Sequence, residues 1–233
     1  MKKIEIKEFG GPEVLEIKNV DIGKPGKHEV LVKNLSIGIN YIDTYHRSGL
    51  YPIPLPSGIG LEACSIIEEV GSEVKLFKVG DRVTRASMPI GTYSEKQIIP
   101  EDKLVKVPDN ISDEVASCIT LKGITAEYLL HRTYKVKKGD KILYHAAAGA
   151  LGQIFCPWAN ALGAEIIGTV GSDEKIEIAK KNGCHHVINY NEKNFVEEVE
   201  KIVGKNGLDV VYDGVGAKTF EGSIEVLKVR GMM

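Results

Sequence analysis

The apolar residues of this chain follow one pattern before residue 110 and another after it. In the first part, short runs of β-forming residues are bounded by glycine and proline, and residues 1–6 alternate polar and apolar side chains. After residue 110, apolar residues take helical spacing at 115–118 and 126–130, and Ser112 is placed to cap the helix start. The change predicts an all-β half followed by a second domain. The other strand-like runs lie at residues 30–32, 65–67, 82–84 and 103–108.

Beyond residue 138, strand-like and helix-like segments alternate strictly, which is typical of a parallel sheet covered by helices. Gly163, Gly183 and Gly204 each follow a predicted helix end, where a left-handed backbone favours glycine. The second half is therefore expected to be a doubly wound α/β domain. Its strands are predicted at residues 141–145, 165–170, 186–189 and 208–213, and its helices at residues 150–162, 173–182, 193–203 and 218–228.

The end of the chain predicts an incomplete sheet. A doubly wound dinucleotide-binding sheet normally has six strands, and this chain ends one predicted helix after the fourth. We therefore expect the sheet to stop before its fifth strand and to leave the fourth, with Val210, Val211 and Tyr212, as an open edge. Because such edges aggregate, a fragment that does not fold independently is one alternative.

Composition excludes several classes of protein. Hydrophobic residues make up 43% of the 233 residues and charged residues 27%, which is enough apolar surface to exclude a disordered chain. Lys and Arg total 30 against 32 Asp and Glu, so there is no basic excess for nucleic acid or an anionic membrane. The four cysteines are scattered, so neither a disulfide framework nor a thiolate zinc site is indicated, and a reducing cytoplasm is expected. No signal peptide is visible, and glycine and proline interrupt the uncharged stretch 142–164, so no membrane span is predicted.

A glycine-rich turn at residues 146–152 lies between a predicted strand and a predicted helix. Compared with the pattern G-x-G-x-x-G, Ala147 takes the first glycine position, and Gly149 and Gly152 keep the other two. Small residues let the backbone approach a pyrophosphate. The N–H groups and the dipole of the helix that begins there stabilise its negative charge. The turn predicts dinucleotide binding; the alternative is a tight strand-to-helix turn with no ligand.

The end of the second predicted strand favours NADP(H) over NAD. Gly171 stands where a carboxylate would bind the ribose of NAD, Ser172 follows, and Lys175 lies one turn into the next helix, within reach of a phosphate. Asp173 and Glu174 argue the other way, but acidic residues in a first helical turn also complement the helix dipole. No Ser-His-Asp or Gly-x-Ser-x-Gly arrangement appears, so nothing marks a hydrolase.

Five further strings occur together in order along the chain: GGPEVL at residues 10–15, GINYID at 38–43, GSEV at 71–74, GDRV at 80–83 and GD at 139–140. With the glycine-rich turn, they resemble the quinone oxidoreductases, the zeta-crystallin branch of the medium-chain dehydrogenases/reductases. The resemblance covers all 233 residues. It implies a GroES-like β domain at residues 1–110 and a Rossmann NADP-binding domain at 111–233, truncated before its fifth strand. It also implies NADPH-dependent reduction of quinones or related electrophilic carbonyls. For a full-length form it implies a homodimer, much of whose contact comes from the part of the family fold that is absent here.

Zinc is not expected. The zinc alcohol dehydrogenases of the same superfamily have a cysteine ligand where this chain has Asn40, and Gly-His-Glu where it has Gly60-Leu61-Glu62. Leucine cannot bind zinc. Without a metal, we expect hydride transfer from the reduced nicotinamide to an acceptor that is already electron-poor, such as a quinone.

The resemblance also implies site residues. Near the nicotinamide it places Asn40, Tyr41, Asp43 and Tyr45, with Arg47 and Tyr51 nearer the entrance; for Tyr41 and Tyr51 the alternative is core packing. Of these, Asn40, Tyr45 and Tyr51 are the predicted catalytic residues. The remaining predicted cofactor contacts are Lys122, Thr125 and Tyr128 at the middle of the cofactor, Gly149, Ala150, Leu151 and Gly152 at the pyrophosphate, Gly171, Ser172, Lys175 and Tyr190 around the adenosine phosphate, and Val215 within residues 213–216 on the far side.

Three positions depart from the family pattern: Ala150 replaces a second consecutive glycine, Pro157 a glutamine and Asn160 a lysine. Proline inside a helix costs about 3 kcal/mol unless the helix kinks. Two other functions stay open beside quinone reduction. One is an enoyl reductase that acts on conjugated thioesters, and the other is a catalytically silent module that binds the cofactor.

Overall fold

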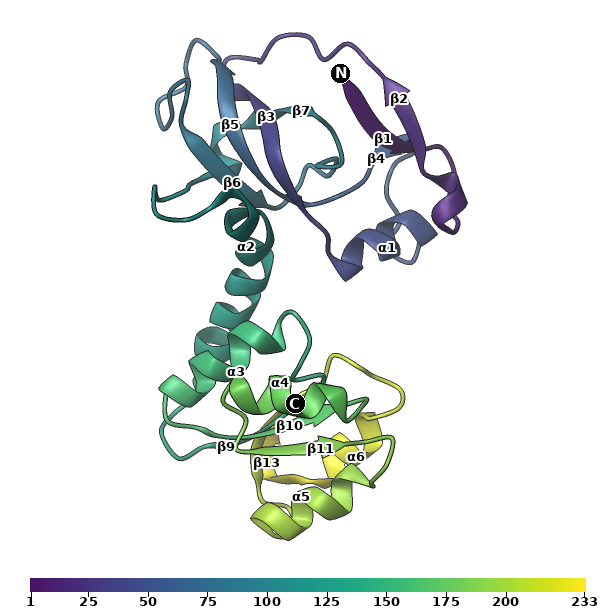
Figure 1. Cartoon of the computed structure of the whole chain (residues 1–233), viewed down its shortest axis with the longest axis vertical. Helices are drawn as coiled ribbons and strands as arrows, with labels where there is room; N and C mark the ends of the chain where they lie inside the picture. Colours follow the sequence, from purple (N-terminus) through teal and green to yellow (C-terminus); the bar gives the residue numbers. More distant parts are fainter. The chain divides into compact units, whose positions relative to one another are not determined.

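The computed structural model describes all 233 residues. The chain forms two units, Met1–Leu121 and Lys122–Met233, and the division falls inside helix α2 (Asp113–Tyr128) (Figure 1). The predicted boundary near residue 110 lies just before this helix. Ser112 caps it as predicted, because its Oγ accepts the Val115 N–H at 3.3 Å. The two helical stretches predicted at 115–118 and 126–130 belong to α2 and to the π-helical segment Leu129–Thr133 that follows it.

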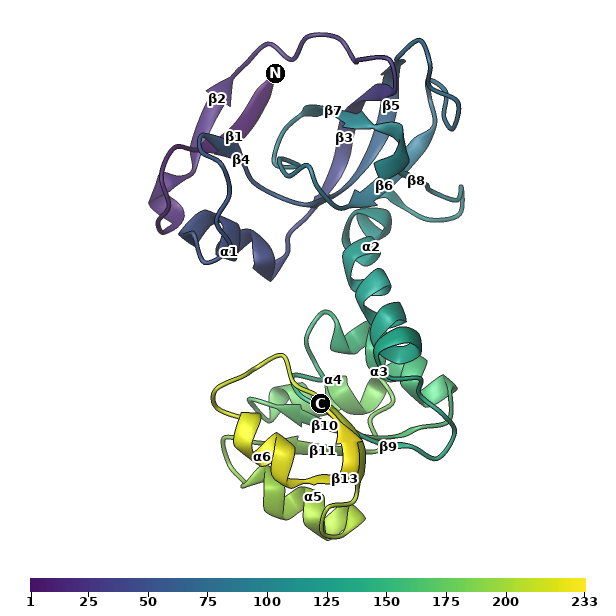
Figure 2. The same ribbon diagram turned by 180° about the vertical axis from the view of Figure 1, so that it is seen from behind.

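The first unit is built from two antiparallel sheets. All five strand-like runs predicted here form strands, although the last is shorter than predicted because a 3-10 turn (Glu101–Lys103) precedes it. Val30, Val32, Ile67, Val83 and Ile99 fill its main core. One sheet has the order β2-β1-β4 and the other β7-β3-β5-β6-β8 (Figure 2). Their strands are β1 (Lys2–Ile6), β2 (Glu16–Asn19), β3 (Glu29–Gly38), β4 (Ser57–Gly58), β5 (Glu62–Val70), β6 (Arg82–Ala86), β7 (Lys96–Pro100) and β8 (Val105–Lys106).

The expectation of an all-β first half is wrong in one place, because residues 41–48 form helix α1 (Tyr41–Ser48). Asp43, at the third helical position, accepts the backbone N–H of Asn40 at 2.9 Å, and this supports the helix start. Gly49 ends the helix with a left-handed backbone, φ +80°. A 3-10 turn, Pro12–Val14, also follows β1.

The second unit is a parallel sheet with helices on both faces (Figure 1). Its order, β11-β10-β9-β12-β13, is 3-2-1-4-5 in order along the chain, which is the doubly wound order. Gly163, Gly183 and Gly204 all have φ between +83° and +88°, so the three predicted helix ends are confirmed. The elements are β9 (Lys141–Tyr144), α3 (Gly152–Ala161), β10 (Glu165–Val170), α4 (Glu174–Lys181), β11 (His186–Asn189), α5 (Phe195–Val203), β12 (Leu208–Tyr212), α6 (Phe220–Glu225) and β13 (Leu227–Met232).

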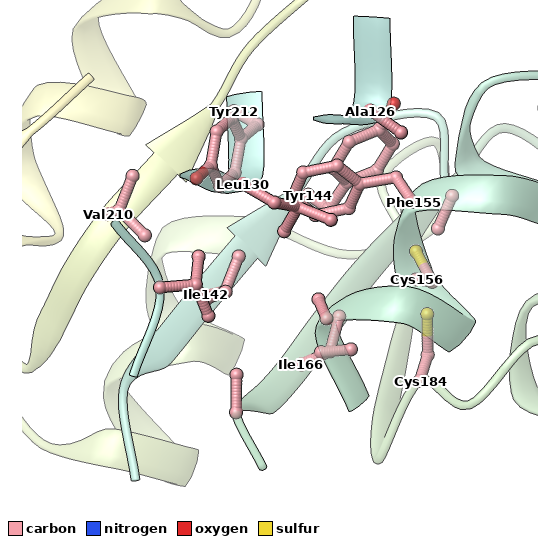
Figure 3. Packing of buried hydrophobic residues seen from close by; sticks show 14 of the residues in the cluster. Ala126, Leu130, Ile142, Tyr144, Phe155, Cys156, Ile166, Cys184, Val210 and Tyr212 are labelled. Carbon is pink, nitrogen blue, oxygen red and sulfur yellow. The ribbon is translucent and has the colours of Figure 1, made fainter. Parts of the chain in front are cut away.

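The sheet of the second unit buries apolar side chains on both faces. On one face Ile142 and Tyr144 pack with α3 and α4, and on the other Leu143 packs with α5. Figure 3 shows the first of these faces, with Ala126 and Leu130 of the α2 region close to the ring of Tyr144. Because β-strand side chains alternate between faces, runs such as residues 142–144 read as continuous apolar segments, as buried parallel strands do.

The predicted end of the sheet is wrong. Helix α6 stops at Glu225, and Leu227–Met232 forms a fifth strand, β13 (Figure 2). This strand pairs parallel with β12. The fourth strand is therefore covered on both sides, and the open edge expected at Val210 and Tyr212 does not exist. Strand β13 pairs with backbone groups at the edge of β12 that would otherwise have no partner in the sheet. The pairing is irregular, since Leu208 opposes Leu227 but Val210 opposes Met232.

Pro157 lies within α3, which continues through it to Ala161, with the proline on the exposed face. Replacing Pro157 by Ala is expected to raise the free energy of unfolding by about 1–3 kcal/mol, because it restores an N–H donor for the carbonyl of Gln153 and removes a ring clash. Urea denaturation measures the change. Asn160→Ala, on the same helix, improves helix propensity but loses packing against Gly183, and is expected to add at most about 0.5 kcal/mol. An equal gain in both variants would contradict the prediction.

None of the helices combines the length and the apolar character that a membrane crossing requires.

Candidate functional site

The turn between β9 and α3 leaves backbone donors exposed where a helix begins. A Cβ on Gly152 would lie 2.4 Å from the carbonyl oxygen of Ala147, so this position accepts no side chain. The N–H groups of Ala150, Leu151 and Gly152 have no acceptor within the protein. Because the first N–H groups of a helix and its dipole attract anions, the turn fits a pyrophosphate. Ala146 turns the chain out of β9 with φ +58°.

The carboxyl end of β10 forms a second small cradle. A Cβ on Gly171 would lie 2.8 Å from the hydroxyl of Tyr190, so a larger residue here would displace the end of this side chain. Asn191 fixes the strand end by donating from its side chain to the Gly171 carbonyl at 2.7 Å. Ser172 and Lys175 lie in one turn, since the Lys175 N–H donates to the Ser172 carbonyl at 3.2 Å. Four of the residues predicted around the adenosine phosphate are thus brought together.

Lys175 supplies a positive charge to this cradle, next to acidic residues at the start of α4. The side chain of Lys175 is exposed and forms no ion pair. Asp173, one of the two acidic residues that argued for NAD, is held by the side-chain amide of Asn189 at 2.8 Å. The amide does not neutralise its charge, so Lys175 lies beside two carboxylates, those of Asp173 and Glu174, at this end of α4.

The loop at residues 213–216 is held by its own carboxylate. Oδ1 of Asp213 accepts the N–H groups of Val215 at 2.8 Å and Gly216 at 2.9 Å. These hydrogen bonds keep the pKa of Asp213 below its ordinary value although burial works against them. Val215 itself is 39% exposed at the carboxyl end of β12.

Behind these loops lies a buried hydrogen-bond chain that the sequence did not predict. The Nδ1 of His145 is 2.9 Å from the hydroxyl of Thr169, and its Nε2 is 3.0 Å from the hydroxyl of Ser223. Ser223 in turn donates to Oδ2 of Asp213 at 2.9 Å. The side chains of His145 and Asp213 are fully buried. No local motif marks this group, because its members are up to 78 residues apart.

Serine, histidine and aspartate here do not form a hydrolase triad. In a triad the aspartate orients the histidine and the serine is exposed to substrate. Here Ser223 lies between His145 and Asp213, and it is fully buried. The order and burial of these three side chains therefore differ from those of a hydrolase triad.

Lys122, Thr125 and Tyr128 follow one another at three-residue spacing along the part of α2 that belongs to the second unit. Residues three apart lie near one another on a helix surface. The side chain of Tyr128 is 42% exposed.

In the first unit, Asn40 and Asp43 are buried in a polar network. The side chain of Asn40 donates to Glu62 at 2.9 Å, and Tyr93 donates to Asp43 at 2.9 Å. Glu62 also accepts the backbone N–H of Leu121 at 2.7 Å. Burial and the hydrogen bond to Asp43 raise the pKa of Tyr93 above its ordinary value. The partners Glu62 and Tyr93 were not predicted from the sequence, in which the Asn-x-x-Asp spacing of a helix cap was the available signal.

The three tyrosines of the α1 region form a row of ring contacts. The ring centroids of Tyr41 and Tyr45 are 5.3 Å apart, and those of Tyr45 and Tyr51 are 5.2 Å apart. Tyr41 is 76% exposed and Tyr51 is 49% exposed, so the core-packing alternative is wrong for both. Arg47 does not extend this row, because its guanidinium donates to the carbonyl of Gly10 at 3.2 Å.

The donors at the zinc positions do not fit a zinc ion. Leu61 is a buried hydrocarbon side chain, and the amide of Asn40 is engaged with Glu62. No three His, Cys, Asp or Glu side chains gather into a metal-binding cluster anywhere in the chain. The four cysteines are all free thiols.

Family models match most of the chain. The model described as "Alcohol dehydrogenase GroES-like domain" matches residues 26–109, and the model described as "Zinc-binding dehydrogenase" matches residues 150–233. The chain is 48% identical over its whole length to a quinone oxidoreductase of Pseudomonas aeruginosa, and covers 72% of that protein. The chain belongs to the quinone oxidoreductase family.

Further relatives match this chain in structure or in sequence. A quinone oxidoreductase of Escherichia coli in complex with NADPH has a TM-score of 0.96 and 48% identity; the match covers 100% of this chain and 72% of that one. A 2-haloacrylate reductase of a Burkholderia species is 47% identical, and the match covers 97% of this chain and 70% of that protein. The predicted family and the predicted architecture of a GroES-like unit and a Rossmann unit are thus confirmed. The roles of individual site residues remain predictions.

Proposed function

We propose that this protein is an oxidoreductase that binds NADP(H) and reduces quinones by hydride transfer without zinc. The observation that carries the proposal is the backbone match to an NADPH-bound quinone oxidoreductase, which extends over the whole chain. NADPH, when bound, supplies the hydride; a proton completes the reduction of the quinone to a hydroquinone. The protein supplies position and hydrogen bonds rather than a Lewis acid.

In the second unit, we assign the cofactor contacts to the residues that form the two cradles. The free N–H groups of Ala150, Leu151 and Gly152 would hold the pyrophosphate, with Gly149 keeping the turn open. Lys175 would pair with the adenosine phosphate. Ser172, Gly171 and Tyr190 would surround the same group, and Lys122, Thr125, Tyr128 and Val215 complete the proposed contacts.

In the first unit, we assign the substrate contacts to the tyrosine row. Tyr45 and Tyr51 would donate hydrogen bonds to a quinone oxygen, where charge develops as the hydride arrives. Tyr41, the most exposed of the three, would lie against the nicotinamide end of the cofactor. Asn40 and Asp43 are buried and hold the start of α1 in place, so we propose that they act through the position of this helix. The free cysteines fit a reducing compartment, and we propose the cytoplasm.

Quinone turnover tests the proposal directly. The purified chain is mixed with NADPH and para-benzoquinone, and loss of the NADPH absorbance is followed; Tyr51→Phe serves as the matched variant because it keeps the ring and removes the hydroxyl. We expect turnover by the unaltered chain and a roughly tenfold lower kcat/KM for Tyr51→Phe, the loss of one hydrogen bond in the transition state. NADPH binding without any turnover would instead support a silent module.

Reduction of a conjugated double bond is the second candidate. It is favoured by the similarity to a 2-haloacrylate reductase, whose name gives an electron-poor alkene as its substrate. The same assay with 2-chloroacrylate and with a crotonyl thioester separates the candidates. A higher kcat/KM for either alkene than for the quinone would replace quinone reduction as the proposed activity.

A further inference from the structure

The buried hydrogen-bond network of Thr169, His145, Ser223 and Asp213 has one arrangement of protons in which every polar atom finds a hydrogen-bond partner. The Asp213 carboxylate can only accept, so the Ser223 hydroxyl donates its single proton to Asp213. Ser223 must then accept from Nε2 of His145, which places the imidazole proton on Nε2. The unprotonated Nδ1 accepts from the hydroxyl of Thr169. His145 is thus a neutral imidazole in the Nε2–H tautomer.

This hydrogen-bond network joins the ends of three adjacent strands. Thr169 lies near the end of β10, His145 directly follows β9, and Asp213 directly follows β12. These strands are neighbours in the order β10-β9-β12. The strand order reverses between β9 and β12, and dinucleotides bind to doubly wound sheets at that point, outside the carboxyl ends of the strands.

Each end of this hydrogen-bond network is also attached to a loop of the proposed cofactor site. On one side, the residue after His145 is Ala146, whose φ of +58° starts the glycine-rich turn, and the Thr169 carbonyl accepts the Ala147 N–H at 3.0 Å. On the other side, Asp213 holds the N–H groups of Val215 and Gly216. His145 is therefore the link between the glycine-rich turn and the 213–216 loop.

We propose that His145 is a positioning residue for the dinucleotide: as the Nε2–H tautomer it fixes the spacing between the glycine-rich turn and the 213–216 loop. It is fully buried and acts through these backbones rather than by contact with the cofactor. The proposal rests on the dinucleotide binding proposed above. The effect does not depend on one unusually strong hydrogen bond. It comes from one side chain that satisfies two polar partners in a buried position.

The surroundings keep His145 neutral. Its ring packs edge-on against Phe195 of α5, with centroids 5.0 Å apart, and against the hydroxyls of Thr169 and Ser223. Asp213, 4.0 Å away, is the one ionisable group facing it. Burial lowers the pKa of His145 below 6.5, although Asp213 acts in the opposite direction. Protonation would make Nδ1 a second donor and leave the Thr169 hydroxyl without its acceptor.

The expected pH dependence follows from this lowered pKa. An unfolded histidine takes up its proton near pH 6.5, whereas folded His145 does so only at lower pH. The stability due to neutral His145 is therefore present above pH 6.5 and is lost as the pH falls below that value. A His145→Gln variant has no such titration, so its stability is expected to fall less than that of the unaltered chain over the same range.

NADPH affinity across a set of variants tests the proposal. His145→Leu removes both hydrogen bonds of the imidazole. Thr169→Val removes one of them, and Ser223→Ala removes the other together with the bond to Asp213, whereas His145→Gln keeps an amide donor for Ser223. The matched control is Val199→Ala, a core change on α5 without a contact to the chain of hydrogen bonds. We expect Kd for NADPH to rise about tenfold in His145→Leu, and by several-fold in Ser223→Ala and in Thr169→Val. It should rise less than threefold in His145→Gln and stay within twofold in Val199→Ala.

Each result decides between a positioning and a merely structural role. If Kd in His145→Leu and Val199→Ala changes in proportion to their losses of unfolding free energy, the residue only contributes to packing and the proposal is overturned. If His145→Leu does not fold, Ser223→Ala and Thr169→Val carry the comparison, and unchanged Kd values in both overturn it. If the unaltered chain binds no NADPH, the proposed function itself fails, which is a different result from binding that is insensitive to His145.

Discussion

Replacing Gly152 by Ala is expected to raise Kd for NADPH about a hundredfold. The added Cβ would meet the Ala147 carbonyl oxygen at 2.4 Å and its carbonyl carbon at 2.7 Å. These are backbone atoms, so α3 must shift away from the turn, and the N–H groups proposed to bind the pyrophosphate move with it. A displacement of about 1 Å at a positioning element costs on the order of a hundredfold. Fluorescence titration with NADPH measures the change.

Gly149→Ala is the graded comparison for that experiment. Its Cβ would meet only the Ala146 carbonyl oxygen, at 3.0 Å, so a small adjustment accommodates it. We expect a clearly smaller rise in Kd than for Gly152→Ala. Equal affinities in the Gly152→Ala variant and the unaltered chain, with both folded by circular dichroism, would show that the pyrophosphate does not bind at this helix end.

Reversal of charge at Lys175 is expected to separate the two nicotinamide cofactors. Lys175→Glu should raise Kd for NADPH about a hundredfold, because it removes a phosphate partner and places a like charge beside the phosphate. Kd for NADH should change less than threefold, since NADH lacks that phosphate. Because Lys175 is exposed, the effect on NADPH should shrink as salt is added.

Lys181→Glu provides the matched control for Lys175. It lies at the other end of the same helix, is exposed, and changes the net charge by the same amount. If Lys181→Glu weakens NADPH binding as much as Lys175→Glu does, the effect is one of general charge. If Lys175→Glu weakens NADPH and NADH equally, the residue does not read the adenosine phosphate and another group must be sought.

Local patterns determined much of the second unit before any contact was known. Alternation of strands and helices, with glycine at the helix ends, predicted four strands and the positions of their helices to within a few residues, because these signals lie within one element. The same approach failed at residues 227–232, where a helix was predicted through Lys228 and a strand formed. Strand β13 depends on the unpaired edge of β12, and no window of sequence contains that edge.

The candidate site divides in the same way. Glycine at 149, 152 and 171 and lysine at 175 were visible in the sequence, since a turn and a helix start fix their surroundings locally. The link through His145 was not, because Thr169, Asp213 and Ser223 meet it only when β10, β9 and β12 lie side by side and α6 packs against them. By itself, the sequence determined which backbone segments make the cradles. The tertiary structure alone decided which distant polar side chains hold them together, because burial requires each polar group to find a partner wherever the fold provides one.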